Sequence, residues 1–227
     1  MTRPSSGVRG ASNSRCGRRE RVGPHALKKH KLVSARPQRE VARVTSPFSA
    51  ADSFEQQTFT GLSLTAEDLS GKHFFRCRFE NCALPESRWK RALLEDCEFH
   101  QCDLTRANVA QLGLRGVKFT ASKVMGVDFS GVSANPDVHF EECHLRYASF
   151  SKLSLRRAKF LRSQLREVNL YDCDLTDAEF SGSDLTGANV RGCTLTRTDF
   201  RRATAVFIDP SHNKVKETRI EMDAAAA

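Results

Sequence analysis

Large apolar residues recur at every fifth position through most of the chain, with mostly polar residues between them. The period begins at Phe54, runs unbroken to Phe129, and after one extra residue resumes at Phe140 and continues to Phe200. A period of five fits neither the roughly 3.6 residues of an α-helical turn nor the alternation of a β-strand. The pattern therefore predicts a chain that turns in five-residue units.

A second, longer period appears as a phenylalanine at every twentieth position. The members of this column are Phe59, Phe79, Phe99, Phe119, Phe140, Phe160, Phe180 and Phe200, with one longer step where the extra residue lies. The simplest geometry with both periods is a four-sided solenoid, in which each residue lies above its equivalent in the preceding coil. We predict about eight such coils over residues 48–205, with the eight phenylalanines as their structural core.

The position two before each large apolar residue is usually small. Seven of the eight cysteines occupy it: Cys77, Cys82, Cys97, Cys102, Cys143, Cys173 and Cys193. We interpret them as free interior thiols that replace Ala or Ser. Disulfides between cysteines on adjacent coils and a metal site are the alternatives. Parallel side chains on adjacent coils, however, hold their Cβ atoms farther apart than a relaxed disulfide prefers.

The formal charge of +9 is unevenly distributed. Residues 1–47 hold 12 Lys and Arg against two acids, whereas residues 48–205 hold 21 acids and 21 bases. Because residues 1–47 also lack aromatic residues, they predict a disordered basic tail. Such a tail is a polyanion-binding arm, a targeting segment or a dispensable extension. The positive charge of the whole chain therefore says nothing about the partner of the repeat region.

Nothing in the repeat region indicates catalysis. The sequence holds no phosphate-binding loop or nucleophile motif, and the repeat's histidines, His73, His100, His139 and His144, fall at outward positions. A filled interior also leaves no pocket for an active site. We therefore expect neither an enzyme nor a cofactor, metal or small-molecule substrate. The chain shows no apolar run long enough for a membrane span and no secretory signal, so we expect a cytoplasmic protein.

Segments such as residues 174–178 (DLTDA) and 183–189 (SDLTGAN) resemble the pentapeptide repeat family, and the resemblance extends over about residues 54–205. It implies an all-β, right-handed quadrilateral β-helix. The opening 59–64 (FTGLSL) and the ending 207–210 (FIDP) are similar to the quinolone-resistance group that includes Qnr proteins and MfpA. That similarity implies a non-enzymatic partner of DNA gyrase or topoisomerase IV, which protects the enzyme from quinolones by imitating DNA.

Two candidate contact sites follow from the resemblance. The break in the repeat supplies a candidate contact loop, Asn135, Pro136 and Asp137, for which a simple bulge is the alternative. A local acidic stretch supplies a candidate acidic patch: Asp172, Asp174, Asp177, Glu179 and Asp184. Residues 206–227 are interpreted as a C-terminal segment with a truncated dimerisation element, so that a homodimer depends on a C-terminal helix.

Two further functions stay open beside topoisomerase binding. The first is a general protein-interaction scaffold with an unknown partner, which the balanced charge of the repeat region favours over DNA mimicry. The second is polyanion binding through the basic tail. The fold alone does not decide among the three.

Overall fold

Each side of the solenoid is a short extended segment that ends at a sharp corner. In the computed structural model, which describes residues 46–221, the corner residue has a positive φ at nearly every fifth position, from Gln56 (52°) to Glu217 (56°). Glycine adopts this conformation most readily, and Gly61 and Gly71 hold two of the corners. Most corners, however, are formed by polar residues. The corner limits each side to five residues and so explains the period of the sequence.

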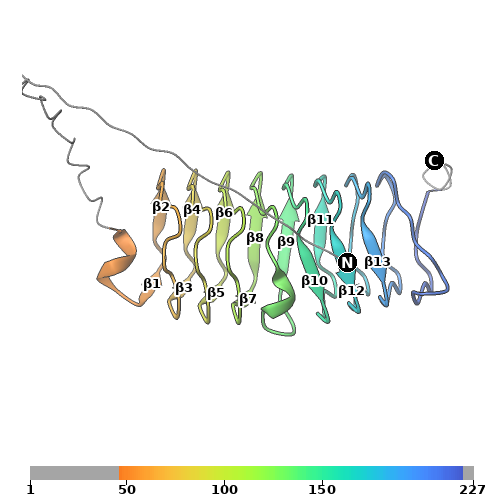
Figure 1. Ribbon diagram of the computed structural model, residues 1–227, viewed down its shortest axis with the longest axis horizontal. Coiled ribbons are helices and arrows are strands. Elements are labelled where there is room, and N and C mark those ends of the chain that lie inside the picture. The colour runs from red at the N-terminus through yellow and green to blue at the C-terminus, as the bar shows by residue number, and fades with distance from the viewer. Residues whose placement is uncertain (1–45, 222–227) are drawn as a thin grey trace, which may run out of the picture. The chain divides into compact units, whose positions relative to one another are not determined.

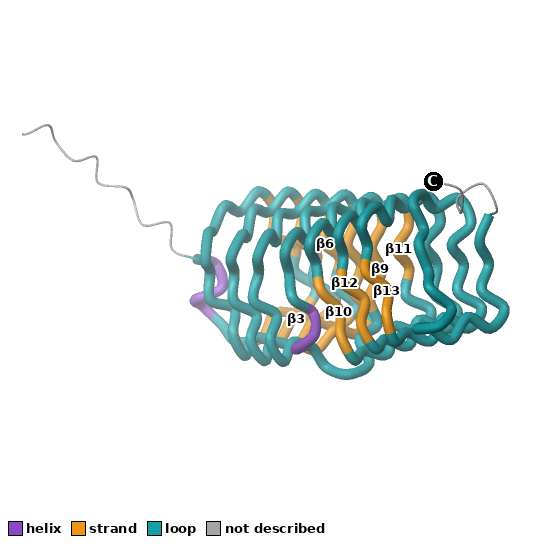
Figure 2. The backbone as a smooth tube through the Cα atoms, turned by 45° about the vertical axis from the view of Figure 1, so that its right-hand side comes forward, coloured by secondary structure: helices purple, strands orange, loops and turns teal. Residues whose placement is uncertain are grey.

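Where extended segments pair between coils, they form short strands. The strands are β1 (Ser53–Glu55), β2 (Thr58–Thr60), β3 (His73–Phe75), β4 (Arg78–Glu80), β5 (Leu93–Glu95), β6 (Glu98–His100), β7 (Gly113–Arg115), β8 (Val117–Thr120), β9 (Val138–Glu141), β10 (Ser149–Ser151), β11 (Lys159–Leu161), β12 (Asn169–Tyr171) and β13 (Asn189–Arg191). Two 3-10 helices accompany them, η1 (Pro47–Ala50) and η2 (Phe129–Gly131). Figure 2 shows these strands as brief stretches within coils that are otherwise loop and turn.

All strand pairs are parallel, and each joins one coil to the next (Figure 1). The sheets have the orders β1-β3-β5-β7, β10-β12-β13 and β2-β4-β6-β8-β9-β11. The register advances by one coil of constant length, as in Phe59↔Phe79. It lengthens by one position in a single coil, where Phe119 lies opposite Phe140 and Lys123 opposite His144. The predicted all-β, right-handed quadrilateral β-helix is confirmed. Within residues 46–221, no helix is long and apolar enough to cross a bilayer.

The eight phenylalanines of the predicted column lie in the interior and stack on one another. Their exposed fractions run from 8% at Phe59 to 0% at Phe200. Successive ring centroids are 4.5 to 5.4 Å apart, with interplanar angles of 27° or less. A stacked aromatic pair contributes about 0.5–1.5 kcal/mol beyond the burial of its area. The column therefore joins each coil to the next in the core as well as through the backbone.

The first coil is closed by the ring of Phe48, which is fully buried. Its centroid lies 4.9 Å from that of Phe59 and 5.9 Å from that of Phe74. Ser46 begins η1 by accepting a hydrogen bond from the Phe48 backbone N–H at 3.2 Å. Ser46 and Pro47, which the sequence assigned to the tail, thus belong to the end of the solenoid. The rest of the predicted disordered tail, residues 1–45, lies outside the described residues.

The solenoid continues beyond residue 205, the end that the apolar period predicted. Residues 206–221 form a further coil, with bridges such as Thr194↔Lys214. Asn213 takes the small interior position and bonds through its side chain to the Cys193 N–H (2.9 Å) and the Val190 carbonyl (3.0 Å). The described part of the C-terminal segment is thus a coil and not the beginning of a helix.

Candidate interaction surface

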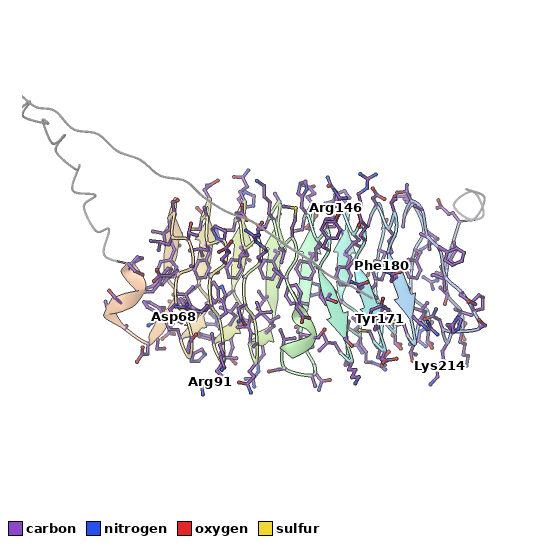
Figure 3. All side chains as sticks on the ribbon, in the orientation of Figure 1. Asp68, Arg91, Arg146, Tyr171, Phe180 and Lys214 are labelled. Carbon is purple, nitrogen blue, oxygen red and sulfur yellow. The ribbon has the colours of Figure 1, made fainter. Side chains whose placement is uncertain are left out.

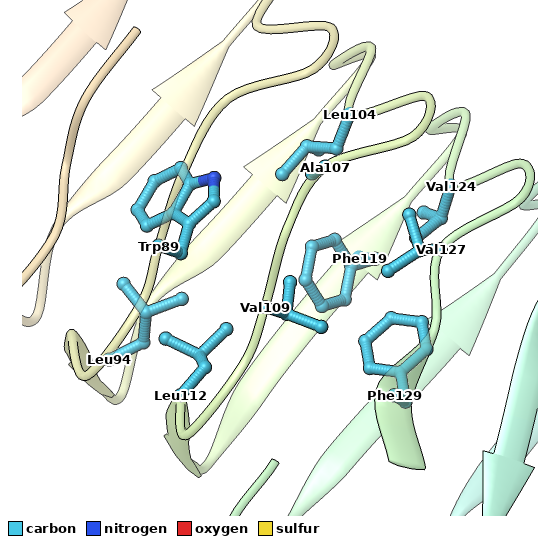
Figure 4. A pocket seen from close by; sticks show the side chains of 10 residues that line it. All are labelled: Trp89, Leu94, Leu104, Ala107, Val109, Leu112, Phe119, Val124, Val127 and Phe129. Carbon is cyan, nitrogen blue, oxygen red and sulfur yellow. The ribbon is translucent and has the colours of Figure 1, made fainter. Parts of the chain in front are cut away.

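Side chains fill the interior of the solenoid. The void at its centre measures about 10 Å³, and its lining is entirely apolar (Figure 4): Trp89, Leu94, Leu104, Ala107, Val109, Leu112, Phe119, Val124, Val127 and Phe129. A space of this size holds at most about one water molecule, and only if polar partners are present. Larger hollows, of about 250 to 460 Å³, are grooves on the outer faces. A partner would therefore bind to the outer surface.

The seven repeat cysteines are buried free thiols. Most donate a weak hydrogen bond to a carbonyl of the preceding coil, as Cys102 Sγ does to Phe79 O at 3.3 Å. Ser183 Oγ makes the same contact to Phe160 O at 2.7 Å, which explains why Cys and Ser alternate at this position. Burial raises the pKa of Cys143 to about 11, so this thiol is not a nucleophile at neutral pH. No metal-binding cluster of His, Cys, Asp and Glu is present among residues 46–221.

Four of the five residues of the candidate acidic patch are paired with bases. The pairs are Asp174 with Arg156 (3.0 Å), Asp177 with Arg197 (2.7 Å), Glu179 with Lys159 (3.9 Å) and Asp184 with Arg166 (2.9 Å). A hydrogen bond from Arg197 lowers the pKa of Asp177, so this carboxylate is ionised at neutral pH. Asp172 is exposed, and within the described residues it has no ion-pair partner. The stretch is therefore a set of ion pairs and not a continuous negative surface.

Similar ion pairs connect coils along the whole solenoid. Examples that join equivalent positions of adjacent coils are Arg78 with Glu98, Arg88 with Asp68, Arg106 with Glu86, Arg115 with Glu95 and Arg162 with Glu142. Most of these side chains are exposed to water, which screens their attraction, so each pair contributes little to stability. Sequence reasoning missed the pairs, although opposite charges one coil apart were visible once the coil length was known. The outer faces thus present paired charges of both signs.

The break in the repeat is a loop that projects beside η2 (Figure 1). Asn135 and Asp137 are exposed, whereas Pro136 is buried. The backbone N–H groups of Ser133 and Asp137 both donate to carbonyls of the preceding coil at 3.0 Å, so the ladder continues around the extra residue. Of the three candidate contact residues, the structure leaves Asn135 and Asp137 exposed and buries Pro136.

Among the described residues, three large aromatic side chains are exposed, and the sequence did not single them out as contact residues. Their exposed fractions are 53% for Tyr147, 38% for Tyr171 and 80% for Phe207. The Arg146 guanidinium lies 4.7 Å from the centre of the Tyr147 ring, and Tyr171 and Phe207 line one groove. Figure 3 labels Arg146 and Tyr171 among the side chains of the solenoid. Exposed aromatic residues are enriched in protein interfaces. The available signal was an aromatic residue at an outward position of the five-residue pattern.

Parallel four-sided coils with a packed interior and a charged exterior define a class of protein, the pentapeptide-repeat solenoid. A family model described as "Pentapeptide repeat region" matches residues 72–136 and 133–208. The chain belongs to the pentapeptide repeat family.

A curated relative is the "Quinolone resistance pentapeptide repeat protein QnrB96" of Scandinavium goeteborgense. It is 27% identical over 122 residues, in a match that covers 45% of this chain and 57% of the relative. The chain thus spans little more than half the length of that relative.

Two solved structures are similar to the described solenoid. One is a trypsin-treated variant of QnrB1, a plasmid-mediated fluoroquinolone resistance protein, with a TM-score of 0.47 and 17% identity over 78% of this chain and 93% of that one. The other is HetL of the cyanobacterium Nostoc sp. strain PCC 7120, a pentapeptide repeat protein involved in heterocyst differentiation regulation. Its TM-score is 0.36, with 18% identity over 74% of this chain and 86% of that one.

Proposed function

We propose that this protein is a non-catalytic interaction protein that binds a type II DNA topoisomerase and protects it from fluoroquinolones. The observation that supports the proposal is the 27% identity to a quinolone-resistance pentapeptide repeat protein. The packed interior, with a central void of only about 10 Å³, also favours binding at the outer surface over catalysis. A topoisomerase partner would place the protein in the cytoplasm.

The loop around Asn135 and Asp137 is the contact site we propose for the topoisomerase. Both side chains are exposed, and the loop breaks an otherwise regular surface. Loops on a rigid scaffold are the usual place for binding residues. Asp172 is a second proposed contact, because it is the member of the acidic stretch without an ion pair within residues 46–221.

Supercoiling by purified gyrase holoenzyme tests the function. The enzyme would be inhibited with a fluoroquinolone, and the full chain would then be added in increasing amounts. We expect supercoiling to recover near a stoichiometric ratio of the two proteins. No recovery at a large excess of the folded chain would contradict the proposed function.

A loop variant tests the contact site in the same assay. We expect Asn135→Ala combined with Asp137→Ala to require more protein for the same recovery. Gln56→Ala is the control, because Gln56 is an exposed corner residue in the first coil, several coils from the loop, and it should behave as wild type. Equal recovery by the loop variant and the control would remove the loop from the contact site.

An interaction scaffold with a different protein partner is the second candidate. The balance of 21 acids and 21 bases over residues 48–205 favours it, because a DNA mimic needs an excess of negative charge. This candidate predicts that the correctly folded chain neither binds gyrase nor restores its supercoiling in the presence of the drug.

A further inference from the structure

The charge of the repeat region is divided into zones along the solenoid, although its total is zero. Residues 48–104 hold ten acids and six bases, residues 105–166 hold four acids and eleven bases, and residues 167–205 hold seven acids and four bases. The net charges of the zones are therefore −4, +7 and −3. The middle coils form a positive belt between two negative ends.

Most arginines of the belt are engaged with acids of the flanking zones. Examples are Arg106 with Glu86, Arg115 with Glu95, Arg146 with Glu167, Arg156 with Asp174 and Arg166 with Asp184. Lys118 and Lys123 are both exposed, and neither is in an ion pair within the described part of the chain; the same holds for Lys152 and Arg157. Their charges are available to an external anion.

Lys118 and Lys123 lie on two neighbouring sides of the solenoid, one on each side of a corner. Each begins a run of Lys and His residues in a column of equivalent positions in successive coils. On the sheet that contains β8, β9 and β11, the register stacks Lys118, His139 and Lys159. On the neighbouring side, bridges stack Lys123 below His144. With coils about 4.8 Å apart, the first column spans roughly 10 Å. These five residues and Arg162, an exposed corner residue between the two columns, are called the basic corner.

The acids around the basic corner are few and already bonded. Glu141 and Glu142 both accept hydrogen bonds from Arg162. On the same face, Glu98 pairs with Arg78 at 2.9 Å and Glu179 with Lys159 at 3.9 Å. In the second column, Asp103 lies one coil before Lys123, and Asp184 lies two coils after His144. The Asp103 carboxylate accepts a hydrogen bond from the Thr105 N–H, and Asp184 pairs with Arg166. Lys159 and Arg162 are thus offset by Glu179, Glu141 and Glu142. Lys118 and Lys123 are the cations of the corner that have no acid partner within the described residues.

His139 lies between two cations and has a free hydrogen-bonding atom. Its Nδ1 is buried without a hydrogen-bond partner within residues 46–221, and its Nε2 is 3.5 Å from Asp137. Burial lowers the pKa of His139, and Lys159 and Lys118 lower it further, while Asp137 and Glu179 oppose the shift. An anion bound over the column would favour the protonated ring.

We propose that the basic corner binds the phosphate backbone of nucleic acid without reading its bases. Phosphate contacts require exposed cations and no apolar anchor. The exposed large apolar residues of the described chain, Tyr147, Tyr171, Phe207 and Ile220, are not members of the corner. Protein interfaces, in contrast, are depleted in lysine and depend on aromatic anchors. This binding is independent of the proposed topoisomerase function.

Fluorescence anisotropy of a labelled random-sequence DNA duplex, titrated with the full chain at several salt concentrations, tests the proposal. The test variant combines Lys118→Gln with Lys123→Gln. The control combines Lys152→Gln with Arg157→Gln. These substitutions remove the same amount of charge from two exposed belt residues at other corners. Because all three proteins retain residues 1–47, the contribution of that basic segment cancels in the comparison.

The corner variant should lose affinity roughly 10- to 60-fold at about 0.1 M salt, and the slope of log K against log salt should become shallower by about 1.8, as expected for two lost phosphate contacts. The control should match wild type in both quantities. Equal losses in the two variants, or no loss in either, would overturn the proposal. Competition by poly-glutamate as strong as by DNA of equal charge would also overturn it, because the site would then accept an acidic protein segment.

The pH dependence of DNA binding gives an independent readout. DNA binding by wild type should strengthen as the pH falls from about 8 to about 6, because protonation of His139 adds positive charge between Lys118 and Lys159. His139→Gln should reduce this difference while retaining the salt dependence due to the lysines. A pH dependence unchanged in this variant would exclude His139 from the site.

Discussion

Replacing Phe160 by Ala tests the role of the phenylalanine column in stability. Phe160 is fully buried, and its ring stacks on Phe140 at 5.4 Å and on Phe180 at 4.9 Å. The ring edge of Phe150 also lies against it at 5.8 Å. The substitution removes the aromatic contacts on both sides and leaves a cavity between three coils.

Removing a buried Phe side chain costs about 3–5 kcal/mol, which includes the cavity. Phe160→Leu is the matched control, because Leu155 and Leu165 fill the equivalent position on the adjacent sides and are fully buried. This variant keeps most of the volume and loses mainly the aromatic stacking, so we expect a cost of about 1–2 kcal/mol. The difference between Phe160→Ala and Phe160→Leu thus separates the cavity cost from the stacking.

Urea denaturation monitored by far-ultraviolet circular dichroism measures both costs. Fluorescence of Trp89, which is buried in an earlier coil, reports separately on the N-terminal part. Because each coil contacts only its neighbours, the transition at Trp89 should shift less than the dichroism transition if the coils unfold in sequence. A loss below about 1 kcal/mol for Phe160→Ala, or equal losses for Ala and Leu, would refute the account of the column.

Three smaller predictions follow from the surface and the interior. Glu86→Gln breaks the exposed pair with Arg106 and should cost less than about 1 kcal/mol in urea denaturation, with no difference from wild type at high salt; a larger, salt-independent cost would contradict the surface account. Hydrogen bonds from Ser211, and then from His212, hold the pKa of Asp209 at about 2, below its ordinary value of 3.8. The stability due to ionised Asp209 should thus be present above about pH 4 and lost as the pH falls towards about 2, and thermal melts of Asp209→Asn should lack this component. In a Cys16→Ser background, the seven buried thiols should react with a thiol reagent only after unfolding, so rapid reaction of the native protein would contradict their burial.

Much of the fold could be predicted because one physical constraint repeats along the chain. A narrow interior admits one large apolar side chain and one small side chain per side, so Phe140 and Cys143 could be placed inside without a structure. The one longer step of the column, between Phe119 and Phe140, predicted the single register change, which occurs between β8 and β9.

Other features could not be predicted because they depend on contacts between residues of different coils. The apolar period ends after Phe200, yet a further coil forms, because Asn213 satisfies its buried side chain with hydrogen bonds across two coils. Pro136 was a candidate contact residue, but it is buried. The acidic stretch looked continuous in the sequence because Arg156 and Arg197, which pair with it, lie on adjacent coils.

Direct binding to a topoisomerase tests the central claim, that this solenoid is an interaction protein for that enzyme. Sedimentation velocity of purified gyrase holoenzyme with the full chain, in the absence of DNA and drug, measures the complex without relying on activity. We predict a saturable complex of defined stoichiometry, weakened by Asn135→Ala with Asp137→Ala and unaffected by Gln56→Ala. Independent sedimentation of gyrase and the folded chain at micromolar concentrations of both would contradict the claim.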